Sequence, residues 1–236
     1  MERALRGLAE PGALELSEVI QLLAWNEMVP AARAVLERAV SLHVGLLTDA
    51  LLDSATDFTI RRRIPRILST TTDARALAGL VAGLDDARFE VRYQCSRAIR
   101  HLLTHHPDLK VDSARFMAVA ERELSVPAPV WHGYRLIDSV EHDEDVSARD
   151  AADQSQRNLE HLFSLLAAVL PAAPLDVALR GLRSDDVALK GVAIEYLEGV
   201  LPAPVWSKLS RLLEVTTVSG GDALARSDRP HPARPQ

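Results

Sequence analysis

Three stretches of this chain share one pattern, and the pattern decides the fold. They are Asp57-x-x-Ile60-Arg61-x-x-Ile64-x-x-x-Leu68, Arg88-x-x-Val91-Arg92-x-x-Cys95-x-x-x-Ile99 and Asp186-x-x-Leu189-Lys190-x-x-Ala193-x-x-x-Leu197. The second copy starts 31 residues after the first, and the third starts 98 residues after the second, close to three further periods. Recurrence at about 30 to 45 residues is typical of stacked helical repeats. The pattern therefore predicts an array of helix pairs.

The composition also favours helices. Hydrophobic residues make up 47% of the 236 residues but aromatic residues only 4%, so Leu, Ala and Val must fill the core. No strand is expected. Cys95 is the only cysteine, which excludes an internal disulfide or a thiolate metal cluster. No stretch approaches the roughly 20 apolar residues that span a bilayer, and no apolar signal core follows Met1. We therefore expect the protein to be located in a reducing compartment, namely the cytoplasm.

Helical periodicity continues through most of the chain and defines its organisation. We expect one all-α, right-handed α-solenoid of about five to six helix pairs over residues 17–214, after an N-terminal extension at 1–16. Residues 141–150 are expected to form an acidic inserted loop, and the Gly- and Pro-containing segment 215–236 a disordered tail. The expected helices are 17–25, 29–40, 43–52, 58–68, 73–84 (capped by Thr72 or Asp73), 89–104, 113–124, 130–140, 158–170, 175–182, 189–200 and 205–213.

The three copies resemble HEAT repeats, in which an acidic turn precedes Val or Ile, then Arg, then a small apolar residue. The chain is similar to bacterial HEAT-repeat proteins over roughly residues 17–214. In a stacked array Arg61, Arg92 and Lys190 can reach the acidic turn of a neighbouring repeat, so we interpret them as a structural charge ladder. The resemblance implies that the second helix of each pair lines a concave face.

Charge is distributed unevenly along the chain. The net charge is −6, which argues against a general nucleic-acid binder. Residues 57–106 nevertheless contain nine Arg against five Asp or Glu, whereas 138–160 contain eight acids against two Arg. The candidate partner-binding residues are the polar side chains outside the apolar stripes of the expected second helices: Arg62, Arg66, Gln94, Arg97, His101, Glu195 and Glu198. We expect a groove that grades from basic to acidic, although solvated helix faces give the same pattern.

Other candidates for chemistry have structural interpretations. His101 and His105 are spaced to share a metal, but no third ligand has a recognisable spacing, so we interpret them as a helix end. Cys95 fills the small apolar position of its repeat and is expected to be a buried thiol. Trp25, Trp131 and Trp206 are expected to pack in the core or between repeats. No catalytic motif is present, and neither a metal nor a cofactor is expected.

These observations favour a non-enzymatic scaffold or adaptor that binds another protein or peptide, an acidic one where Arg62, Arg66 and Arg97 make the contacts. Two alternatives come from the same resemblance. One is a DNA-base glycosylase or nucleic-acid binder, which the arginine-rich half favours and the net charge disfavours. The other is a tetrapyrrole lyase or chaperone, for which no Cys or His placement gives specific support. The sequence leaves the partner's identity and the oligomeric state open.

Overall fold

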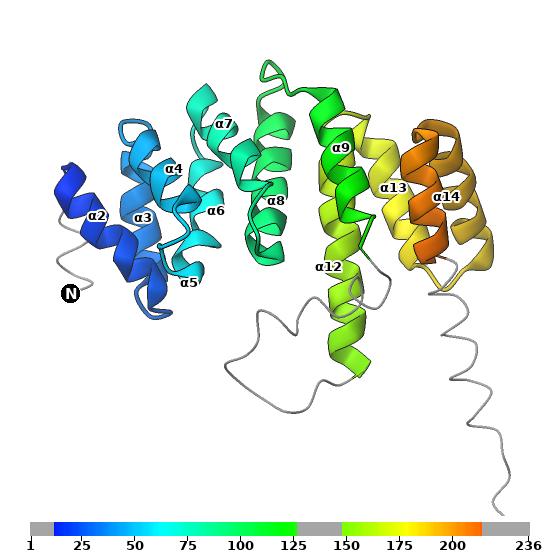
Figure 1. The fold of residues 1–236 in the computed structure, drawn as a ribbon, viewed down its shortest axis with the longest axis horizontal. Coiled ribbons are helices and arrows are strands. Elements are labelled where there is room, and N and C mark those ends of the chain that lie inside the picture. The colour runs from blue at the N-terminus through cyan, green and yellow to red at the C-terminus, as the bar shows by residue number, and fades with distance from the viewer. Residues whose placement is uncertain (1–11, 127–147, 214–236) are drawn as a thin grey trace, which may run out of the picture.

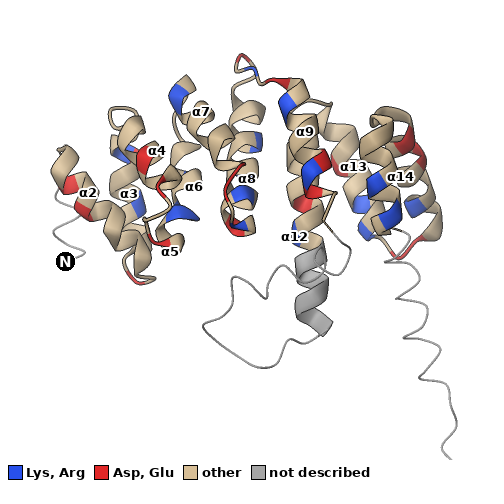
Figure 2. Ribbon diagram, viewed as in Figure 1, with Lys and Arg blue, Asp and Glu red and all other residues tan. Residues whose placement is uncertain are grey.

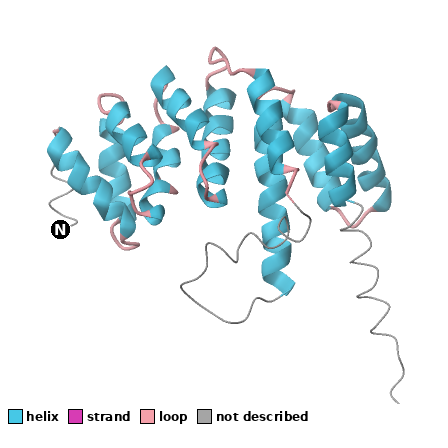
Figure 3. Ribbon diagram, viewed as in Figure 1, coloured by secondary structure: helices cyan, strands magenta, loops and turns pink. Residues whose placement is uncertain are grey.

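The computed structural model describes residues 12–126 and 148–213, and within them every regular element is a helix (Figure 3). The all-α prediction is confirmed for these residues, none of whose helices is long and apolar enough to cross a membrane. The elements are α2 (Ala13–Gln21), η1 (Leu22–Ala24), α3 (Val29–Ala39), α4 (Val44–Leu52), α5 (Phe58–Arg61), α6 (Ile64–Leu68), α7 (Ala74–Gly83), α8 (Phe89–His105), α9 (Ser113–Glu123), α12 (Ala148–Leu166), α13 (Ala172–Arg183), α14 (Val187–Val200) and a last helix over 203–213.

The helices stand side by side in one row, from α2 at one end to α14 at the other (Figure 1). Each helix packs mainly on its neighbours in that row: α4 on α7, α7 on α8, α8 on α12, and α13 on α14. One apolar cluster runs through the row, from Leu16 in α2 to Leu212 in the last helix. A single helix pair cannot bury its own apolar side, so the core is built between neighbours along the row.

Aspartate side chains start several of these helices. Asp57, Asp73, Asp112 and Asp186 are N-cap residues whose carboxylates accept hydrogen bonds from backbone N–H groups in the first turn. The first N–H groups of a helix have no partner inside it, so such a cap satisfies one or two of them and suits the helix dipole. Of the two caps proposed for the helix that starts near residue 73, Asp73 is the one that forms.

Glycines opposite the small repeat residues allow two helix pairs to close tightly. A Cβ added to Gly83 in α7 would lie 2.5 Å from the Sγ atom of Cys95 in α8. At the corresponding place in the third repeat, a Cβ on Gly181 in α13 would lie 3.0 Å from the Cβ atom of Ala193 in α14. Cys95 and Ala193 occupy the same position of the repeat pattern, so the two pairs share a contact as well as a sequence.

Four details differ from the sequence prediction. The expected helix 58–68 is divided into α5 and α6, because Pro65 has no N–H group to continue the helical ladder. Helix α2 starts at Ala13 and buries Leu16, inside the expected extension. Helix α12 begins at Ala148, before the expected end of the acidic loop at residue 150. Trp25 is 58% exposed, so its predicted packing is wrong.

Helix α9 packs against α12, which also lies beside α8. The predicted pairing of α9 with 130–140 falls outside the described residues. The expected helix 130–140, with Trp131, lies outside the described residues, as do residues 1–11, most of the acidic loop and the expected tail at 215–236. Trp206 is partly buried against the core, as predicted.

Candidate protein-binding groove

Arg61 and Arg92 are buried and bind neighbouring helices and turns, so they are structural. Arg61 is 7% exposed, forms an ion pair with Asp86 in the turn between α7 and α8, and donates from Nε to the carbonyl oxygen of Leu51 at 2.9 Å. This is the predicted contact between a repeat arginine and the next acidic turn. Asp85 in the same turn pairs with Arg115 and Arg122 of α9, at 2.5 and 2.7 Å. The acidic turn therefore connects the repeats on both sides of it.

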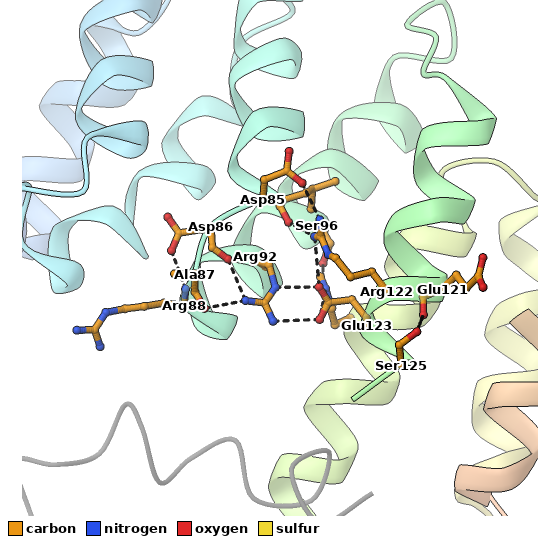
Figure 4. A network of polar contacts seen from close by, with 12 residues as sticks. Asp85, Asp86, Ala87, Arg88, Arg92, Ser96, Glu121, Arg122, Glu123 and Ser125 are labelled. Atoms are coloured by element: carbon orange, nitrogen blue, oxygen red, sulfur yellow. Dashed lines mark hydrogen bonds and ion pairs between the residues drawn. The ribbon is translucent and has the colours of Figure 1, made fainter. Parts of the chain in front are cut away.

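Arg92 is held by a network between α8 and α9 (Figure 4). Its Nε and Nη2 atoms donate to the two carboxylate oxygens of Glu123 at 2.8 and 3.1 Å, and Nη1 donates to the carbonyl oxygens of Asp86 and Ala87. Burial alone would raise the pKa of Glu123, but the paired guanidinium of Arg92 outweighs it and holds that pKa below its usual value. Glu123 thus stays ionised in the core.

His161 in α12 extends this network. Its Nδ1 atom lies 2.8 Å from the hydroxyl oxygen of Ser96, which donates to the carbonyl oxygen of Tyr93. Its Nε2 atom lies 3.8 Å from the Glu123 carboxylate, too far for a hydrogen bond, and has no other partner among the described residues. Burial is the main cause that lowers the pKa of His161, which favours the neutral ring. Ser96, His161 and Glu123 are each at most 4% exposed, so this is a packing network that a substrate cannot reach.

The third ladder position differs. Lys190 is partly exposed, and within the described part of the chain it has no ion-pair partner. The predicted contact with an acidic turn is therefore wrong for Lys190. The carboxylate of Asp186 caps the N-terminus of α14. Among the described residues, no further acidic turn follows at this end of the row.

Three cavities follow one another along α6, α8 and α12 and form a groove, which we call the basic groove. The first, of about 300 Å³, lies between α3, α6 and α8. The second, of about 390 Å³, shares Arg66 and Gln94 with the first, and the third, of about 540 Å³, shares Arg97 and His101 with the second. Lys and Arg recur along α8, the middle helix of this surface (Figure 2).

Five of the seven predicted site residues line the basic groove: Arg62, Arg66, Gln94, Arg97 and His101. Arg62 follows α5, Arg66 lies on α6, and the other three lie on α8, which packs against α6. Glu195 and Glu198 do not join them. Both are exposed on α14 and line none of the three cavities. The acidic groups that do lie in the groove are Glu37, Glu90 and Glu160.

Most charges in the groove are already paired. Arg33 pairs with Glu37 at 3.2 Å, Arg100 with Asp176 at 2.5 Å, and Arg183 with Glu160 at 2.9 Å. Glu160 also accepts from the hydroxyl group of Tyr93 at 2.5 Å, a residue whose pKa burial and Glu160 raise to about 12. Glu90 accepts from Gln94 at 2.8 Å and pairs with Arg157 at 3.3 Å. Arg63 donates to the carbonyl oxygen of Leu23 and to the Asn26 amide oxygen.

Three guanidinium groups in the groove are different. Arg62, Arg66 and Arg97 have no carboxylate partner within the described residues. Arg62 lies over the ring of Phe58, and Arg97 over the ring of Tyr93, each 5.5 Å from the ring centre. Such contacts orient a guanidinium but leave its N–H groups free to donate. The groove therefore presents three cations without a carboxylate partner among the described residues, two of which, Arg62 and Arg97, are oriented by aromatic rings.

The two histidines at the end of α8 do not form a metal site in the described part of the chain. The rings of His101 and His105 are 4.2 Å apart, but His105 uses Nδ1 for a contact of 2.8 Å with the His101 carbonyl oxygen. No third ligand accompanies them among the described residues. Burial, then His105, His106 and Arg66, lowers the pKa of His101, so its ring is neutral near pH 7. A neutral ring can donate or accept a hydrogen bond in the groove.

Sequence reasoning missed several groove residues. Arg33, Arg100 and Arg183 come from α3, α8 and α13, and only the arrangement of the row shows that they share a surface. Arg100 was predictable, because it lies one turn from Arg97 on the same helix. Cys95 is fully buried, as predicted, and burial raises the pKa of its thiol.

Compared with known proteins, the chain matches no family model, no curated protein and no solved structure.

Proposed function

We propose that this protein is a non-enzymatic scaffold whose basic groove binds an acidic segment of another protein. The observation that carries the proposal is the set of unpaired guanidiniums, Arg62, Arg66 and Arg97, on one continuous groove. A carboxylate can take two parallel N–H···O bonds from a guanidinium, which gives direction as well as affinity. Because the other groove cations already have partners, these three are the ones free to recognise a ligand.

The fold that we propose for this function is a right-handed solenoid of five HEAT-like helix pairs and a closing helix. The shared contacts of Gly83 with Cys95 and of Gly181 with Ala193 support the repeat, as does the Arg61–Asp86 ion pair between repeats. A solenoid exposes a long surface that follows an extended peptide. We propose the cytoplasm as its location, which suits a protein whose one cysteine is a buried thiol.

Two observations favour a peptide over a nucleic acid. The protein carries a net charge of −6, which repels a polyanion outside the groove. No Phe, Tyr or Trp side chain lines the three cavities formed by the described residues, whereas proteins that flip or stack bases commonly use such aromatic platforms. Glycosylase activity therefore ranks second. A tetrapyrrole lyase or chaperone ranks third, and visible absorbance of the purified protein would support it.

The test is the affinity of a fluorescein-labelled Glu-rich peptide, measured by fluorescence anisotropy at low and physiological salt. We expect the variant Arg62→Glu/Arg66→Glu/Arg97→Glu to bind at least about a hundredfold more weakly, since each charged hydrogen-bond donor is worth roughly tenfold or more. Capture from a cell lysate with the same pair of proteins then identifies natural partners that depend on the groove.

The matched control carries the same change of net charge away from the groove. Arg75→Glu/Lys110→Glu/Arg211→Glu alters three exposed residues that line none of the cavities and should retain the affinity within about twofold. Equal losses in the two triple variants would show that only net charge matters. Tighter binding of single-stranded DNA of matched charge, with a steep salt dependence, would transfer the proposal to the nucleic-acid alternative.

A further inference from the structure

The far end of the row carries an apolar surface that the basic groove does not explain. Helix α14 carries apolar residues around most of its circumference, beside the charged Lys190, Glu195 and Glu198, yet only Ala193 and Leu197 are buried in it. Val187 is 82% exposed, Val192 63% and Leu189 53%, and Val177 on the adjacent α13 is 59% exposed. A helix that is apolar all round is normally buried, and the end repeats of stacked arrays normally have a polar outer face. At this end of the row, Val187, Leu189 and Val192 of α14 are instead exposed to solvent.

The exposed residues form a ridge and a groove side by side. Leu189, Val192 and Tyr196 project from α14 along one edge of a cavity of about 620 Å³, and Pro174, Val177 and Gly181 of α13 line the other edge. Gly181 lines the cavity where α13 and α14 approach closely, since a Cβ on it would lie 2.9 Å from the carbonyl oxygen of Leu189. The ridge on α14 is an apolar helix surface, and the cavity beside it is the kind of groove that such a helix fills.

The charges at the edges of this surface are complementary. Arg180 lines the cavity from α13, and Glu195 is exposed on α14 next to Tyr196; neither has an ion-pair partner among the described residues. When α14 of one molecule rests on α13 of another, a basic edge meets an acidic edge. A two-fold contact makes this pairing twice, since each molecule supplies both edges.

We propose that α13 and α14 form an isologous dimer contact with a second copy of this chain. In that contact the ridge of each α14 fills the α13–α14 groove of the other molecule, and Arg180 of each pairs with Glu195 of the second copy. The ridge, the groove and both charges lie on one face, so two copies of this face can complement each other. We therefore favour a second copy of the chain over an unrelated helix as the occupant of the groove. The contact lies at the end of the row, apart from Arg62, Arg66 and Arg97, and is independent of the proposed function.

The test is the mass of the full chain by sedimentation velocity, from micromolar to hundreds of micromolar protein. We expect a monomer–dimer equilibrium that Val192→Glu weakens by at least tenfold in Kd, while circular dichroism and Tm stay unchanged because Val192 is exposed. Leu42→Glu is the matched control: Leu42 is 81% exposed near the opposite end of the row, and its variant should dimerise like the wild type.

Charge reversal tests the geometry. Arg180→Glu should weaken the dimer, and adding Glu195→Arg to the same chain should restore it, which only reciprocal pairing between copies explains. A wild-type chain that stays monomeric at all concentrations would overturn the proposal. So would a dimer that is insensitive to Val192→Glu, or open-ended oligomers that grow with concentration, since these indicate a different or head-to-tail contact.

Discussion

Helices α8 and α14 begin with the same repeat pattern but place it in opposite surroundings. In α8 nine residues are buried, including Arg92, whose guanidinium is saturated by Glu123 and two carbonyl oxygens. In α14 two residues are buried, and the equivalent Lys190 has no ion-pair partner among the described residues. The comparison teaches that the repeat pattern specifies the helix pair, whereas the neighbours in the row decide whether its basic residue is structural.

Removing the ladder arginine gives the largest expected effect. Arg92→Met leaves the buried Glu123 without its hydrogen-bonded partner and with only the more distant Arg122, 3.5 Å away, so we expect the free energy of unfolding to fall by about 3–5 kcal/mol. Lys190→Met, the same change in the third repeat, should alter it by no more than about 0.5 kcal/mol. Urea unfolding followed by circular dichroism measures both.

A second variant separates the ion pair from general damage to the core. Arg92→Met/Glu123→Met removes both charges, and we expect it to recover most of the loss, because apolar replacements of a buried pair are often neutral. Should the double variant be as unstable as Arg92→Met, packing around α8, and not the unpaired carboxylate, would account for the effect.

Acidification should act through the same carboxylate. The Arg92 guanidinium holds the folded pKa of Glu123 below its usual value of 4.5, so the ionised form stabilises the fold above about pH 4.5. This contribution is lost as the pH falls below 4.5, by at most roughly 1.4 kcal/mol per pH unit until the folded pKa is reached. Glu123→Gln should be less stable at neutral pH and change less over that range. Parallel pH profiles of the two proteins would locate the dependence elsewhere.

Substitutions of Gly83 and Gly191 should change the free energy of unfolding by smaller amounts and in opposite directions. Gly83→Ala places a Cβ 2.5 Å from the Sγ atom of Cys95, and we expect a loss of about 1–3 kcal/mol in unfolding free energy. Gly191 on α14 has open space around it, so Gly191→Ala should stabilise the helix by up to about 1 kcal/mol. Thermal unfolding distinguishes the opposite signs. A neutral Gly83→Ala variant would mean that α7 and α8 can separate at little cost.

The smallest expected effect concerns the reactivity of the Cys95 thiol, which should be limited by its burial. Cys95 is fully buried and its pKa is raised, so a thiol reagent at pH 8 should modify the native protein only as fast as it unfolds. Adding urea should accelerate the reaction in parallel with unfolding. Rapid modification of the native protein would show that the contact between α7 and α8 opens locally.

The sequence predicted helices and their order well because the apolar periodicity is strong and the caps are aspartates. It placed Arg62, Arg66 and Arg97 on one surface because they flank the apolar stripes of neighbouring second helices. It could not predict that α12 packs against both α8 and α9, since the apolar pattern of a helix does not say which helices it meets. The break at Pro65 was visible in the sequence, but the strength of the repeat pattern hid it.

The sequence could not predict which charged side chains form ion pairs with one another. Arg92 and Arg97 lie on the same helix and differ little in sequence context, yet one meets Glu123 from a segment 31 residues away and the other meets no carboxylate among the described residues. Glu195 and Glu198 were assigned to the groove by analogy between second helices. The analogy fails there because none of the three groove cavities extends to α14.

The most direct test of the account compares Arg92→Met with Arg97→Met, the same substitution at two positions of α8. For each variant both the free energy of unfolding and the affinity for the Glu-rich peptide are measured. The account predicts that Arg92→Met loses stability but binds the peptide normally once folded, whereas Arg97→Met keeps its stability and binds about tenfold more weakly. If Arg97→Met binds like the wild type, or if the two variants lose stability equally, the division between structural and recognition arginines is wrong.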